Sequence, residues 1–189
     1  MNEFPRDKMA IILRWLDELS VDSRLMIIIS ASRIDDLLKG LLQKVMVHQP
    51  GSSDSLFESD RPLGSFSARI ALAYRLGLVD REFESFLQAI RRLRNDAAHS
   101  SEHIDLSKSP HVDRVNHLQA LASNAPMWSI FSKEQFIPKN DPHRSLCASI
   151  ILGVLSLEVA MLTAKQLNPA QNCGFHLVRM IPEENEPTN

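Results

Sequence analysis

Hydrophobic residues recur every three or four positions through most of this chain, the spacing of an α-helix with one buried face. The pattern predicts helices over residues 6–19, 22–47, 65–76, 80–97, 111–123 and 145–167. Glycines and prolines fall between these segments, and no segment alternates with period two. The pattern therefore predicts an all-α fold, a helical bundle of about five to seven helices with little or no sheet.

Polar residues stand where the predicted helices begin and end. Asp22 or Ser20, Ser65 and Asp80 precede the second, third and fourth helices, where a side-chain oxygen can accept a hydrogen bond from the first turn. Gly77 follows the third helix, at the position of a left-handed C-terminal cap. These residues predict the boundaries of three helices.

The last predicted helix contains the most apolar run, Leu146 to Leu157, which is 12 residues long and stops at Glu158. A membrane-spanning helix needs roughly 20 such residues, so we expect a buried core helix and no membrane partner. The first ten residues have no apolar stretch of signal-peptide length, which favours a cytoplasmic protein.

Length and composition favour one ordinary globular domain. We expect residues 1–180 to form it and residues 181–189, which are acidic and proline-containing, to be a disordered tail. The formal charge of −2 argues against a polycation that coats nucleic acid. Cys147 and Cys173 are far apart and belong to no CxxC pair, so neither a disulfide framework nor a structural zinc site is expected. No cofactor motif occurs, and we expect no cofactor and no metal.

Arg94 lies at the edge of the apolar stripe of the fourth predicted helix. An arginine there needs partners for its five donors. Asp35, Asp36 and Glu158 are candidates, because each interrupts an apolar helix. These four residues therefore predict a buried or half-buried ion pair between helices.

A catalytic interpretation of the same helix end remains open. His99 can transfer protons near neutral pH, Arg94 can hold a phosphate, and Asn95 can orient a substrate. These are the components of metal-independent RNA cleavage through the 2′-hydroxyl. One arginine and one histidine are few for this task, so two copies meeting across a symmetric homodimer would make a more complete site.

Residues 61–100 resemble the mannitol operon repressor family of helical bacterial proteins. The matching pieces are Pro62-Leu63-Gly64, residues 67–72, residues 76–79, Phe83 and the pair Arg94-Asn95, with looser support from residues 35–38. The resemblance implies an all-helical fold and a regulatory role, without an evident DNA-reading element.

The stretch from Arg94 to His99 also resembles the signature of the HEPN superfamily. It has an arginine, an asparagine directly after it, three further residues and then a histidine. This superfamily contains helical, often dimeric proteins, many of which are RNA-cleaving toxins or defence proteins. The resemblance implies that Arg94 contacts phosphate, His99 transfers a proton and Asn95 positions them.

Three functions follow. The leading interpretation is a regulatory or interaction protein that acts through protein contacts as a homodimer. The second is an HEPN-type endoribonuclease. The third is a DNA-binding repressor, because residues 61–94 carry seven arginines against three acids and the third and fourth helices could imitate a helix-turn-helix.

Overall fold

The computed structural model of the chain describes residues 14, 22–48, 54–100, 104–129 and 141–167. Five α-helices lie within these ranges: α2 (Ser23–Val45), α3 (Phe66–Arg75), α4 (Arg81–His99), α5 (His111–Ser123) and α7 (Pro142–Thr163). The described residues also form one short 3-10 helix, η1 (Ser55–Phe57), and contain no strand. The all-α prediction is confirmed. The predicted helix over residues 6–19, apart from Arg14, and the predicted tail lie outside the described residues.

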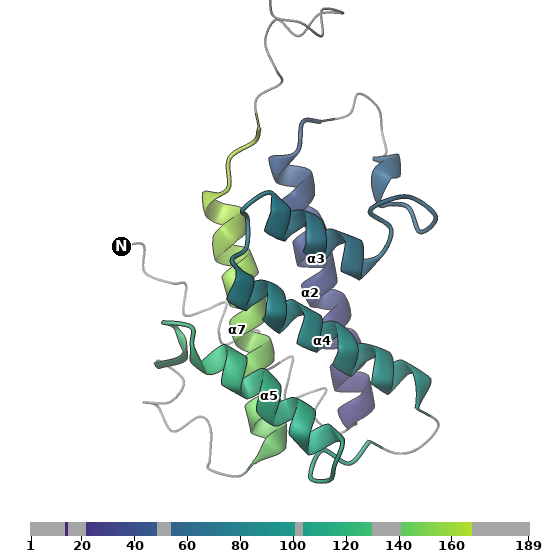
Figure 1. Cartoon of the computed structure of the whole chain (residues 1–189), viewed down its shortest axis with the longest axis vertical. Coiled ribbons are helices and arrows are strands. Elements are labelled where there is room, and N and C mark those ends of the chain that lie inside the picture. Colours follow the sequence, from purple (N-terminus) through teal and green to yellow (C-terminus); the bar gives the residue numbers. More distant parts are fainter. Residues whose placement is uncertain (1–13, 15–21, 49–53, 101–103, 130–140, 168–189) are drawn as a thin grey trace, which may run out of the picture.

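The two longest helices form the long axis of the bundle. Figure 1 shows α2 and α7 running lengthwise in the same direction, with α3, α4 and α5 crossing them obliquely. α2 packs against α7, α3 and α4, while α5 bridges α4 and α7. α4 runs antiparallel to α5 beside it. One hydrophobic core joins all five helices.

Side-chain caps fix where most of the helices begin. Asp22, Ser65, Asp80 and Asp141 each accept a hydrogen bond from a backbone N–H of the first turn of α2, α3, α4 and α7. Gly77 has φ +68° just after α3, so the predicted left-handed position is confirmed. α4 extends two residues beyond the predicted end at residue 97 and includes His99.

A polar loop leads into α5. The Asp105 carboxylate accepts hydrogen bonds from the Ser107 hydroxyl at 2.5 Å and the Ser107 N–H at 2.9 Å. The Lys108 ammonium lies 3.0 Å from the same carboxylate. The Ser107 hydroxyl, followed by Lys108 and the Ser107 N–H, holds the pKa of Asp105 well below its usual range. These contacts hold together the turn of backbone at residues 105–108, just before α5.

α7 is the most apolar element of the fold. By length and composition alone it could cross a membrane, with a mean hydropathy of 2.1 over its most apolar window. In the structure most of its residues from 145 to 157 are buried against the neighbouring helices. The prediction of a buried core helix is therefore confirmed, although the helix begins three residues earlier and ends four residues earlier than the pattern predicted.

Candidate functional site

α4 carries most of the residues that the sequence analysis singled out. One face of this helix is buried in the core through Phe86, Leu87, Ile90, Leu93 and Ala97. The spacing of these residues leaves the opposite face to polar side chains. Arg92 and His99 are exposed there, while Arg94 is exposed at the edge of the apolar face. The core therefore fixes the helix and orients a basic surface outward.

Arg94, Asn95 and His99 all lie at the C-terminal end of α4. The Arg94 Nη1 donates a hydrogen bond to Asn95 Oδ1 at 3.3 Å. Asn95 is half-buried, and His99 is the exposed last residue of the helix. On a continuous helix His99 is about 40° from Asn95 and about 140° from Arg94 around the axis. One chain therefore places the arginine and the histidine on different sides of α4.

The end of α4 is anchored to the start of α2. The Arg24 guanidinium donates a hydrogen bond to the carbonyl of Ser100, the residue after the helix. This contact satisfies one of the carbonyls that a helix C-terminus leaves without an intrahelical partner. It also gives the His99 backbone a fixed position relative to α2.

The four residues predicted to form an ion pair do not come together. Asp35 pairs with Arg69. The Arg69 Nε lies 2.7 Å from Asp35 Oδ1, and the Arg69 Nη2 lies 2.6 Å from Asp35 Oδ2. Glu158 lies 3.7 Å from Arg33. Within the described residues, neither Arg94 nor Asp36 is in an ion pair, and Asp36 is exposed.

Sequence reasoning missed Arg69 as the buried arginine of the fold. Arg69 shares a helical face with the buried residues Phe66, Ile70 and Ala73, so the same apolar-stripe argument applied to Arg94 would have found it. Its Nη1 also donates to the Leu63 carbonyl at 2.8 Å. Arg69 therefore ties α2, α3 and the loop before α3 together.

The predicted helix-turn-helix would use α4 as its recognition helix, and the start of α4 is acidic. The first turn of α4 carries Glu82 and Glu84, which repel phosphate where a recognition helix would approach the duplex. Phe83 stacks on Phe86 with ring centroids 5.5 Å apart, and Phe86 is buried in the core. The start of α4 therefore serves packing.

Metal ligands do not cluster in the part of the chain that the structure describes. No group of three or more His, Cys, Asp or Glu side chains there could hold an ion.

The fold is similar to a chain in the X-ray structure of the MtlR–HPr complex from Escherichia coli. The TM-score is 0.55 at 16% sequence identity, and the match covers 80% of this chain and 98% of that chain. This similarity supports the resemblance to the mannitol operon repressor at the level of the fold. The sequence matches no protein-family model, and no curated protein matches it.

Proposed function

We propose that this chain is a helical regulatory protein that acts in the cytoplasm by binding another protein, in transcriptional or related regulation. One observation carries the proposal: the shared fold spans 98% of a chain from a structure that is itself a complex between MtlR and HPr. A fold retained over nearly a whole partner-binding chain supports a similar mode of action, although function resides in surfaces rather than in the fold itself.

HPr is the first partner to test. Titration of HPr into the purified chain in a calorimeter should give saturable binding with a dissociation constant in the range of about 1 µM or tighter. An unrelated protein with the same net charge as HPr serves as the control for non-specific charge attraction, which fades as salt rises. The absence of heat at high micromolar concentrations would remove HPr from the proposal.

The second candidate function is an HEPN-type endoribonuclease. It is favoured by the exposure of both Arg94 and His99 at one end of α4 and by the hydrogen bond between Arg94 and Asn95. Because Arg94 and His99 lie about 140° apart on one helix, a site would need the second copy of a homodimer to bring an arginine to each histidine. Light scattering distinguishes such a dimer from the 21.3 kDa monomer.

Replacing His99 by alanine tests the nuclease directly. If the candidate is correct, wild-type protein cuts RNA in the presence of a chelator, and His99→Ala lowers the rate by about 10²-fold or more because the proton-transfer group is lost. The melting temperature should stay almost unchanged, since His99 is exposed. His48→Ala, an exposed histidine beyond the end of α2, is the matched control. Cutting that survives His99→Ala would show that the activity does not come from this site.

DNA binding is the weakest of the three functions, because of the acidic first turn of α4. A repressor would bind its operator with a sequence preference that persists as salt rises. Weak, sequence-blind binding that falls steeply with salt would reflect phosphate contacts alone.

A further inference from the structure

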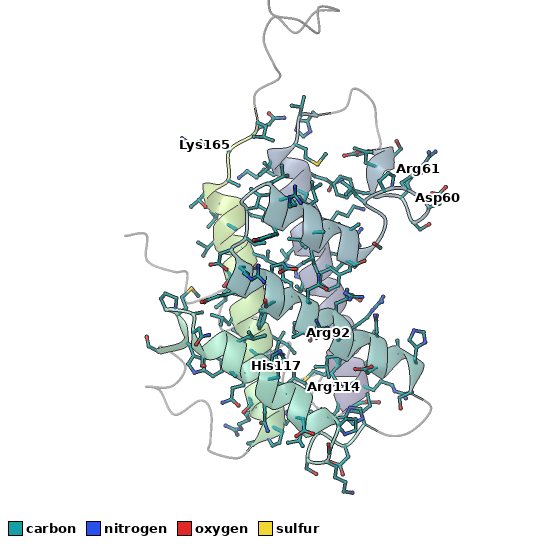
Figure 2. The ribbon with its side chains drawn as sticks, viewed as in Figure 1. Asp60, Arg61, Arg92, Arg114, His117 and Lys165 are labelled. Atoms are coloured by element: carbon teal, nitrogen blue, oxygen red, sulfur yellow. The ribbon has the colours of Figure 1, made fainter. Side chains whose placement is uncertain are left out.

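A cleft lined mainly by charged and imidazole-bearing residues lies between α4 and α5. Its cavity measures about 230 Å³. Ala89 and Arg92 from α4 line it, with Asp113, Arg114 and His117 from α5. Figure 2 shows the labelled side chains of Arg92, Arg114 and His117 gathered over these two helices.

The two carboxylates around this cleft already have partners. Asp96, one turn after Arg92 on α4, lies 2.7 Å from the Arg114 guanidinium. Asp113 accepts a hydrogen bond from the hydroxyl of Ser109, the residue two positions before α5. Each of these carboxylates therefore has a partner other than Arg92.

Arg92 and His117 are left with unused donors. Within the described residues, neither side chain takes part in a hydrogen bond or an ion pair, and both are exposed. Arg92 and Arg114 approach the cleft from different helices, so a ligand between them can contact two guanidinium groups and an imidazole. Such a set of N–H donors matches an anion with several oxygens.

We propose that this cleft binds a phosphate group, either free phosphate or the phosphate of a small molecule. A phosphate monoester carries about −1.5 to −2 charges near neutral pH and three acceptor oxygens, enough to meet donors that arrive from two helices. A carboxylate has one charge and two oxygens in a plane, so it can meet fewer of these donors at once. Pockets for drug-sized ligands begin at roughly 300 Å³, so this cavity suits a smaller molecule.

The proposal is independent of partner binding and of the candidate nuclease. Arg92 and Arg94 are two residues apart and thus about 200° apart around α4, on opposite sides of the helix. Arg94 is not among the residues that line the cleft. A ligand in the cleft would therefore not contact Arg94.

The test is a residue-resolved nuclear magnetic resonance titration of the full chain at constant ionic strength. The probes are inorganic phosphate, glycerol 3-phosphate and acetate. Both phosphates should shift the amide signals of Arg92, Arg114 and His117 saturably, and acetate should not. If glycerol 3-phosphate binds more tightly than inorganic phosphate, the ligand is a phosphorylated small molecule. If the two bind equally well, the ligand is free phosphate.

Arg92→Gln should weaken phosphate binding by about tenfold or more, because it removes a charge-assisted hydrogen bond. Arg61→Gln is the matched control, since Arg61 is an exposed arginine at the far end of the molecule in Figure 2. Arg94→Gln should also bind normally. The proposal is overturned if Arg61→Gln or Arg94→Gln weakens binding as much as Arg92→Gln, or if phosphate gives no saturable shifts. Unchanged melting temperatures show that each variant is folded.

Discussion

Replacing Arg69 by methionine is expected to lower the free energy of unfolding by about 3–5 kcal/mol, the usual cost of removing one partner from a buried ion pair. The Arg69 side chain is 10% exposed and that of Asp35 is 20% exposed. The substitution leaves a largely buried carboxylate on α2 without its two hydrogen bonds, and it deprives the Leu63 carbonyl of a donor. Urea denaturation followed by circular dichroism measures the loss.

Arg75→Met is the matched control, because Arg75 is an exposed residue at the end of the same helix. It should change the free energy of unfolding by no more than about 0.5 kcal/mol. The double variant Asp35→Leu/Arg69→Met should recover most of the loss, since it removes the stranded charge and keeps the volume filled. A loss below about 1 kcal/mol in Arg69→Met would mean that the pair does not hold α3 to α2.

Replacing Gly153 by valine is expected to lower the free energy of unfolding by about 2–3 kcal/mol through overpacking. A Cβ on Gly153 of α7 would lie 2.7 Å from Phe86 Cε1 and 3.3 Å from Ile34 Cδ1. Both neighbours are buried in the core, so neither can move aside freely. The close approach of α7 to α4 and α2 therefore depends on this glycine.

Gly40→Ala is the control that measures how replacing a helical glycine changes the free energy of unfolding without overpacking. Gly40 also lies inside a helix, α2, but a Cβ there would make only an ordinary contact of 3.5 Å with Met161 Cε. The substitution should stabilise the protein by about 0.5–1 kcal/mol, because alanine loses less backbone freedom on folding than glycine. Combining Gly153→Val with Phe86→Leu should restore part of the loss. Equal effects of Gly153→Val and Gly40→Ala would contradict the packing argument.

The helices with a clear apolar stripe were predictable to within two residues at each end. For α3, Ser65 and Gly77 mark the two ends by local chemistry that needs no other part of the chain. α7 was less well predicted because it is apolar on nearly all sides, so its periodicity does not mark its ends. Its start depends on Asp141 as the cap and on Pro142 in the first turn.

The candidate site was predictable only in part. The local sequence places Arg94, Asn95 and His99 on one helix, but whether an arginine at the edge of a stripe is buried depends on which helix packs beside it. α3 brings Arg69 to Asp35, while Arg94 is exposed. The cleft with Arg92 and His117 joins residues 25 positions apart, and no motif links them.

The sequence by itself determined the all-helical fold, the caps and turns that bound its central helices, and the set of polar residues on α4. These features follow from periodicity and from hydrogen bonds between residues close in the chain. Only the tertiary structure decided which charges meet, because the pairs Arg69–Asp35 and Arg114–Asp96 join different helices. Helix packing brings such residues together because it buries the apolar faces of the helices. The free energy of that burial depends on the apolar area and hardly on which polar side chains become neighbours.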